Sequence, residues 1–142
     1  MATPALKLLR TPALRTPVLT TRSLHSSPSR RVQFINASKA DFDRAVTNAP
    51  PDRLVLVDFY AEWCGPCHAL SPVLRRLADT HAPPFDLLTV DVEDEPRGGF
   101  ALSQAHKVRA LPTVVAYRGG KRVDQFVGAL NEPAVVAFIN KV

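Results

Sequence analysis

The sequence predicts an α/β fold, with a mixed, mostly parallel central sheet of about five strands flanked by about four helices. Continuous apolar, β-branched runs at Leu54–Tyr60 and Phe85–Val92 are typical of strands buried on both faces of a sheet. Helical stretches separate these runs, and helical crossovers place the strands that they connect parallel to one another. Gly119-Gly120, between two later strand candidates, indicates an antiparallel hairpin near the end of the chain.

The first elements alternate between strand and helix. Val32–Ile35 is a short strand candidate, and the long buried run Leu54–Tyr60 is the second strand. Between them, Ser38 with Asp41 three residues later is the pattern of a helix N-cap, and the helix that it opens continues to Val46.

The remaining elements complete the order βαβαβαββα. A helix is expected from Cys64 to about Thr80, and Pro72 inside it should kink it. Asn131 is a suitable N-cap for the last helix, whose first turn contains a proline. The elements between these two helices are a strand at Phe85–Val92, a short helix at Phe100–Lys107, and strands at Thr113–Tyr117 and Arg122–Val127.

The positive charge of the chain is concentrated at its start. The formal net charge is +5, but residues 1–31 contain six of the 18 basic residues and no acidic residue. The remaining 12 basic residues nearly balance the 13 acidic ones, so residues 32–142 carry about −1 and nucleic-acid binding by the folded part is not expected. The two ranges therefore define a leader and a separate folded domain.

The leader, residues 1–31, is Arg-rich, Ser/Thr-rich, free of acids and interrupted by prolines, which is the composition of an organellar transit peptide. Arg22-Ser23-Leu24-His25-Ser26-Ser27 resembles the pattern cut by peptidases of the mitochondrial matrix, and cleavage there in two steps would leave Val32 first. The Arg content favours the mitochondrion. The chloroplast is the alternative address, and a basic tail retained in the mature protein is the alternative role.

No stretch approaches the roughly 18 apolar residues of a membrane-spanning helix, so membrane insertion is not expected. The chain has two cysteines, Cys64 and Cys67, whose close spacing gives a disulfide little value as a staple. A reactive or metal-binding pair is the better interpretation.

The cysteine pair lies where the buried strand Leu54–Tyr60 passes into a helix. Unpaired backbone N–H groups and the helix dipole stabilise a thiolate there, so we expect an exposed, attacking Cys64 and a shielded, resolving Cys67. Zinc would need about four ligands, and of the histidines only His68 lies near the pair. Cys64–His68 also fits the C-x-x-C-H haem pattern, but the only methionine is Met1 and the preceding strand is unlike a haem-binding helix bundle.

The segment Val57-Asp58-Phe59-Tyr60-Ala61-Glu62-Trp63-Cys64-Gly65-Pro66-Cys67 resembles the thioredoxin family. The resemblance covers residues 32–142 and implies a thioredoxin fold. It extends to Pro72, which matches the family's kinked helix, to Ala110-Leu111-Pro112-Thr113, which matches a cis-proline loop facing the cysteines, and to Val127-Gly128-Ala129, which matches a glycine that keeps the docking surface flat.

The resemblance implies a role for each matching residue. Cys64 is the expected nucleophile and Cys67 the resolving cysteine of a redox disulfide, which Gly65 and Pro66 tune. Asp58 lies within an apolar strand, where burial raises its pKa and suits it to accept the proton of Cys67. The alternative for Asp58 is a buried carboxyl satisfied by hydrogen bonds. The expected substrate-binding residues are Trp63, Leu111, Pro112 and Gly128; an ordinary trans turn is the alternative for Pro112.

The chain departs from the family pattern at three places. Thr89 occupies a strand position where many relatives carry a lysine facing the buried aspartate, and His68 replaces a basic residue after the second cysteine. The stretch between Pro96 and Pro112 is about four residues longer than usual, with Arg97–Phe100 as the insertion.

We therefore expect a thiol-disulfide oxidoreductase that reduces protein disulfides in organellar redox homeostasis, with no bound cofactor or metal. The resemblance implies that an NADPH-dependent flavoprotein, thioredoxin reductase, recharges it, and that clients are disulfide-containing proteins such as peroxiredoxins or reductases. We expect a monomer. The alternatives are a non-catalytic binding module or redox switch, and a disulfide oxidase or isomerase; the absence of a histidine between the cysteines favours the reducing direction.

Overall fold

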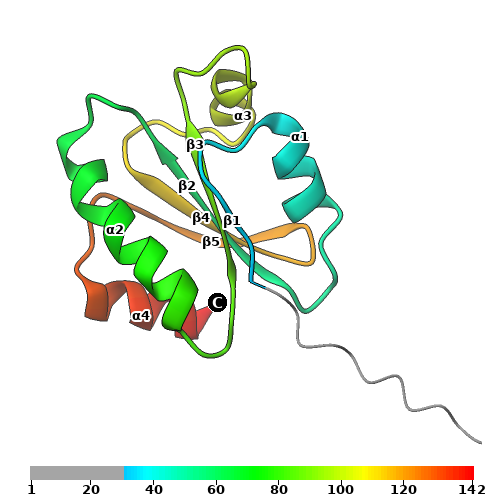
Figure 1. The fold of residues 1–142 in the computed structure, drawn as a ribbon, viewed down its shortest axis with the longest axis vertical. Coiled ribbons are helices and arrows are strands. Elements are labelled where there is room, and N and C mark those ends of the chain that lie inside the picture. Colours follow the sequence, from blue (N-terminus) through cyan, green and yellow to red (C-terminus); the bar gives the residue numbers. More distant parts are fainter. Residues whose placement is uncertain (1–30) are drawn as a thin grey trace, which may run out of the picture.

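Five strands form one mixed sheet in the order β1-β3-β2-β4-β5 in the computed structural model, which describes residues 31–142. Strands β1, β2 and β3 run parallel, β4 is antiparallel to β2, and β5 is antiparallel to β4. The predicted parallel strands and closing hairpin are therefore confirmed (Figure 1). The strands span Gln33–Phe34 (β1), Leu54–Tyr60 (β2), Asp86–Asp91 (β3), Thr113–Arg118 (β4) and Lys121–Val127 (β5).

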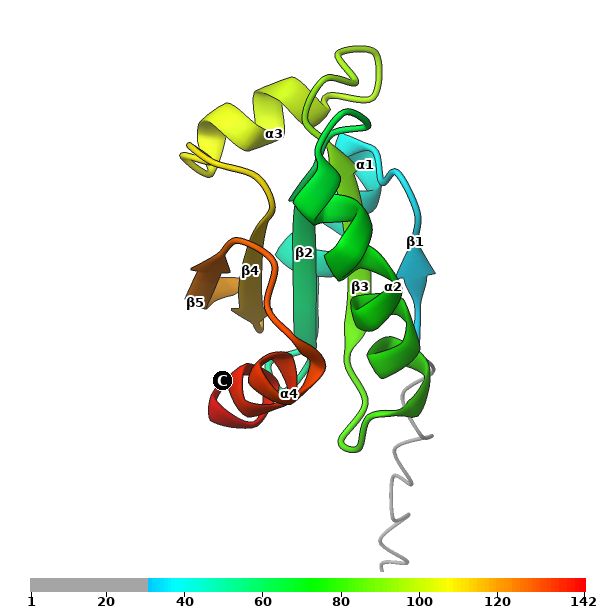
Figure 2. The same ribbon diagram turned by 90° about the vertical axis from the view of Figure 1, so that its left-hand side faces the viewer.

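Helices cover both faces of this sheet. Helices α2 and α4 pack on one face, and α1 and α3 lie on the other (Figure 1); Figure 2 looks onto the face that α2 and α4 cover. The predicted order of elements is confirmed, with small shifts at the element ends. The helical segments span Lys39–Phe42 (α1), Asp43–Thr47 (η1, a π-helical continuation of α1), Gly65–Thr80 (α2), Gly99–Ala105 (α3) and Glu132–Lys141 (α4).

The apolar core has two halves because successive residues of a strand point to opposite faces of the sheet. Along β2, Leu54 and Leu56 contribute to the cluster beneath α2 and α4, whereas Val57 and Phe59 contribute to the cluster beneath α1. Asp58 is two residues beyond Leu56, so its side chain faces α2 from the most deeply buried strand of the sheet. The strand thus carries one carboxyl group into the core.

The predicted N-caps form. Ser38 Oγ accepts a hydrogen bond from the backbone N–H of Asp41 at 3.2 Å, and the Asp41 carboxylate accepts one from the N–H of Ser38 at 3.0 Å, which makes a reciprocal capping box. Asn131 Oδ1 accepts from the N–H of Ala134 at 3.0 Å and caps α4. These caps satisfy backbone donors that have no partner within the helix.

A buried ion pair joins the ends of β2 and β3. Arg53 Nε donates to Asp86 Oδ2 at 2.6 Å, and the backbone N–H of Val32 donates to Asp86 Oδ1 at 2.7 Å. The side chains of Arg53 and Asp86 are 12% and 7% exposed. The start of the folded domain is thereby tied to the sheet.

The predicted leader lies outside the described residues, apart from its last residue. Arg31 donates side-chain hydrogen bonds to the backbone carbonyls of Asp79 and His81, at the C-terminal end of α2. None of the helices within residues 31–142 is both long enough and apolar enough to cross a membrane.

Candidate functional site

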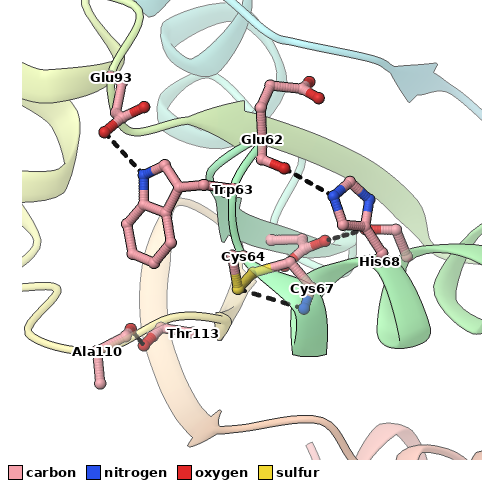
Figure 3. The surroundings of a disulfide bond; sticks show 10 residues. Glu62, Trp63, Cys64, Cys67, His68, Glu93, Ala110 and Thr113 are labelled. Carbon is pink, nitrogen blue, oxygen red and sulfur yellow. Dashed lines mark hydrogen bonds between the residues drawn. A yellow bond between two sulfur atoms is a disulfide. The ribbon is translucent and has the colours of Figure 1, made fainter.

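The cysteine pair lies at the N-terminus of α2, immediately after the turn that follows β2. Cys64 is the N-cap residue, and its Sγ accepts a hydrogen bond from the backbone N–H of Cys67 at 3.3 Å. Pro66 occupies the first turn, where its missing N–H costs no helical hydrogen bond. Cys64 and Cys67 form a disulfide (Figure 3). The predicted position of the cysteine pair, at the start of the helix that follows β2, is confirmed.

Both cysteines are buried in this disulfide form. Cys64 is 3% exposed and Cys67 is 1% exposed. The expectation of an exposed Cys64 is therefore wrong for this disulfide form, in which both cysteines belong to a small apolar cluster. In that cluster Leu111 and Val92 pack against the cysteines and Ala61. Cys67 is the more enclosed of the two by a small margin.

Asp58 is fully buried on the face of the sheet that α2 covers. Burial raises the pKa of its carboxyl group from 3.8 to about 7, and two smaller effects oppose that rise: a hydrogen bond from Ser71 and the positive charge of Arg75. Ser71 Oγ donates to Asp58 Oδ2 at 3.3 Å, while Oδ1 is a buried oxygen with no hydrogen-bond partner among residues 31–142. The predicted rise in pKa is confirmed, and near neutral pH the group both binds and releases a proton.

Thr89 is the direct neighbour of Asp58 on β3, since the two residues pair in the parallel register. The position inferred for Thr89 from the family pattern is therefore confirmed. Its Oγ1 accepts a hydrogen bond from the backbone N–H of Asn36 at 2.9 Å. The cation that lowers the pKa of Asp58 is Arg75, nearly three turns into α2, and not a residue of β3.

Two hydrogen bonds fix the turn that carries the cysteines. Trp63 is 69% exposed, and its Nε1–H donates to Glu93 Oε1 at 2.8 Å. On the other side, His68 Nε2–H donates to the backbone carbonyl of Glu62 at 2.7 Å (Figure 3). The indole ring is thereby held beside the disulfide with most of its surface facing solvent.

The proline loop also takes its expected form. The Leu111–Pro112 peptide bond is cis. The loop is closed by Thr113 Oγ1, which donates to the carbonyl of Ala110 at 2.7 Å, and by the N–H of Gly128, which donates to the carbonyl of Pro112 at 2.8 Å. Gly128 has φ +93° and open space around it, so a side chain there would strain the backbone and project outward. The cis bond is confirmed, while the role of Gly128 in keeping a docking surface flat stays a prediction.

Some of these contacts had no signal in the sequence. Ser71 and Arg75 read as polar positions of an amphipathic helix, and Glu93 reads as part of an acidic turn. Tertiary packing brings these residues to their partners: α2 places Ser71 and Arg75 near Asp58, and the β3–α3 turn places Glu93 at Trp63. A second cis peptide bond, Ala82–Pro83, also went unpredicted.

Within residues 31–142, no group of three or more His, Cys, Asp or Glu side chains is arranged to hold a metal ion. The chemistry that this site offers is reversible: two thiols can close into a short ring at a helix N-terminus, next to a buried acid that titrates near neutral pH. That combination defines the class of thiol-disulfide oxidoreductases.

Comparison with known proteins narrows the class to a family. The thioredoxin family profile matches residues 33–141, and the chain belongs to that family. It is 33% identical over 109 residues to a thioredoxin of Chlorobaculum thiosulfatiphilum, covering 77% of this chain and 95% of the relative. It is 32% identical to chloroplastic thioredoxin Y1 of Arabidopsis thaliana, covering 87% and 70%.

Solved structures of thioredoxins also resemble this chain. The structure of Fasciola hepatica thioredoxin superimposes with a TM-score of 0.65 at 33% identity, covering 76% of this chain and 97% of that one. The chain therefore has the thioredoxin fold and is a thiol-disulfide oxidoreductase that reduces protein disulfides.

Proposed function

We propose that Cys64 is the nucleophile and Cys67 the resolving cysteine in this reduction. The observation that carries the assignment is the position of Cys64 Sγ at the N-cap of α2, where it accepts the N–H of Cys67. In the reduced protein the same N–H and the positive end of the helix dipole stabilise a thiolate on Cys64. Cys67 lies one turn further in, so its sulfur meets the client only through Cys64.

The reaction proceeds in two exchanges. The Cys64 thiolate attacks one sulfur of the client disulfide; a Cys64–client bond forms, the client S–S bond breaks, and the first client thiolate leaves and takes a proton. The Cys67 thiolate then attacks Cys64 Sγ, which forms the Cys64–Cys67 disulfide and releases the second client thiolate. The client gains two electrons and two protons, and the cysteine pair is oxidised.

Asp58 is proposed to accept the proton that Cys67 must lose before the second exchange. A carboxyl group with a pKa of about 7 is matched to proton transfer near neutral pH. Its Oδ1, buried and without a hydrogen-bond partner among the described residues, has free capacity for the proton. Ser71, which bonds the other oxygen, keeps the carboxyl group oriented.

The remaining predicted site residues shape the approach to Cys64. Trp63, Leu111, Pro112 and Gly128 are proposed to contact the client, and Gly65 and Pro66 to set the geometry of the redox ring. Gly65 and Gly128 have no atom within 4 Å of where a side chain would begin, which leaves room for a client on both sides of the site.

An NADPH-dependent flavoprotein, thioredoxin reductase, is proposed to return two electrons to the disulfide, so that the chain needs no cofactor of its own. The proposed clients are disulfide-containing proteins such as peroxiredoxins or reductases, met by a monomer. Both cysteines are present and paired, which favours catalysis over a non-catalytic binding module. The oxidase or isomerase alternative predicts that the disulfide form transfers its bond to reduced clients.

Residues 1–31 are proposed to direct the chain to the mitochondrial matrix and to be removed there, leaving residues 32–142. The support is their composition, six basic residues and no acid. The chloroplast is the alternative, which the similarity to a chloroplastic relative fits. Fractionation of cells that carry the C-terminally tagged full chain, with mass spectrometry of the recovered protein, tests both points. An intact chain in the cytosol would refute them.

Trapping of mixed disulfides tests the roles of the cysteines. Cys67→Ser removes the resolving thiol, so covalent complexes with clients should accumulate and dissolve on addition of a thiol reductant. Cys64→Ser removes the nucleophile and should trap none. Equal trapping by the two variants would show that the roles are assigned wrongly.

A further inference from the structure

We propose that the segment Arg97–Gln104 forms one wall of a client-selecting groove beside Cys64, which accepts an extended segment of a disulfide-bonded protein that carries a large apolar side chain and a basic side chain near its reactive cysteine. The proposal rests on the disulfide reduction described above and names the class of substrate that this chain prefers.

The groove has a volume of about 510 Å³ and opens to solvent. Its inner end reaches the redox site, because Trp63 directly precedes Cys64 and Leu111 packs against the cysteine cluster. In Figure 3 the ring of Trp63 extends from the disulfide towards Glu93, above the Ala110–Thr113 segment. The apolar side chains that line the groove are Trp63, Val92, Phe100, Val108 and Leu111.

Phe100, in the first turn of α3, is the aromatic residue of this wall. It is 48% exposed although it is a large aromatic side chain. An aromatic ring left in solvent beside the 69% exposed ring of Trp63 is typical of the centre of a binding surface. An apolar side chain placed between the two rings would bury both.

The loop that presents Phe100 is held in place by the backbone. The carbonyl of Arg97 accepts from the N–H of Lys39 at 2.8 Å, and the N–H of Gly99 donates to the carbonyl of Asp94 at 2.8 Å. Gly98 has φ +83°, and a Cβ on Gly99 would lie 1.9 Å from the carbonyl oxygen of Asp91, so both positions require glycine. Phe100 is therefore exposed by a tightly packed segment and not by a loose one.

The charged residues that line the groove determine which polar side chain of the client is favoured. Glu93 and Glu95 line the side of the β3–α3 turn, and Arg109 lies among the residues of the proline loop. Glu93 is engaged by Trp63, whereas the carboxylate of Glu95 has no hydrogen bond or ion pair among residues 31–142. A basic side chain of the client complements Glu95, and Gln104, on α3, offers hydrogen bonds to an extended backbone.

Reduction of three synthetic disulfides tests the proposal. Two are peptides whose single cysteine is joined to a chromogenic aryl thiol, with a leucine close to the cysteine and either a lysine or a glutamate next to the leucine. The third is the symmetric aryl disulfide, which is too small to fill the groove. Reduced full-length protein is mixed with each in a single turnover, and the rate at which the coloured thiol is released gives the second-order rate constant of the first exchange.

The wild-type protein should reduce the lysine peptide several-fold faster than the glutamate peptide. Phe100→Ala should lower this rate constant for both peptides about tenfold, which corresponds to about 1.4 kcal/mol. Glu95→Gln should abolish the preference for lysine. Both variants should still reduce the aryl disulfide, which shows that they are folded and keep a working redox pair. Val123→Ala is the matched control, because Val123 is likewise 48% exposed but lies on β5 and does not line the groove.

Equal rates with both peptides, or a Phe100→Ala variant that behaves like Val123→Ala, would overturn the proposal and leave the reductase function intact. Failure of the wild-type protein to reduce even the aryl disulfide would refute the function itself. A concentration-dependent dimer that Phe100→Ala dissociates would show that the groove binds a second copy of this chain, which also overturns the proposal.

Discussion

Replacing the buried Asp58 by asparagine should change how the stability of the oxidised protein depends on pH. The folded-state pKa of Asp58 is about 7, against an ordinary value of 3.8, because burial disfavours the charged form. Between these two pH values the native protein holds a proton that the unfolded chain releases. The stability that this group supplies is therefore fully present below about pH 3.8 and is lost as the pH rises through about 7.

The size of the effect follows from the shift. At about 1.4 kcal/mol per pKa unit, a rise from 3.8 to about 7 removes roughly 2.5 kcal/mol between about pH 5 and about pH 8. The asparagine side chain of the variant carries no charge at any of these pH values, so the variant should not show this loss. It should therefore gain about that much stability relative to wild type across the interval.

Urea unfolding of the oxidised proteins at several pH values measures this difference. The disulfide keeps both cysteines from titrating, and groups that both proteins share, such as the half-buried His106, cancel in the difference between wild type and variant. Asp52→Asn, which removes an exposed carboxylate, is the matched control and should follow the wild-type curve. Ser71→Ala should raise the pKa of Asp58 further and steepen the loss at alkaline pH, because the hydroxyl now bonds the carboxylate. Parallel pH curves for wild type and Asp58→Asn would refute the reasoning.

Three other substitutions test separate parts of the fold and site. Thr89→Lys places a cation next to Asp58 and should move the alkaline-rising limb of single-turnover reduction to lower pH; superimposable profiles would mean that the two side chains are uncoupled. Arg53→Met leaves the carboxylate of Asp86 buried without its cation and should cost about 3 kcal/mol in urea unfolding, whereas a change within error would show that the pair is dispensable. Gly99→Ala should cost about 1–3 kcal/mol, because its Cβ meets a backbone carbonyl oxygen; an unchanged midpoint would show that the loop yields freely.

Most of the elements could be predicted from the sequence because their signals are local. The run Leu54–Tyr60 forms a strand with the predicted bounds, since β-branched residues buried on both faces favour no other conformation. Ser38 and Asn131 cap helices because a short polar side chain needs only its own neighbours to do so. The cysteines could be placed at the start of a helix for the same local reason.

What the sequence could not predict depends on tertiary packing. Ser71 and Arg75 reach Asp58 only because α2 crosses β2 at that height, and periodicity along the helix does not reveal the crossing. The sequence likewise predicted one continuous helix after Ser38, where the structure has α1 followed by a π-helical turn. Exposure of Cys64 was predicted from its position at the start of a helix, whereas in the disulfide form tertiary packing leaves it 3% exposed.

Catalysed reduction of insulin by dithiothreitol tests the central claim, that the Cys64–Cys67 pair reduces protein disulfides. Precipitation of the reduced insulin chains is followed with wild-type protein, with Cys64→Ser, and with dithiothreitol alone. The wild-type protein should accelerate precipitation well above the rate with dithiothreitol alone, and Cys64→Ser should return it to that rate. A wild-type rate equal to that of dithiothreitol alone, or a Cys64→Ser variant as fast as wild type, would contradict the claim.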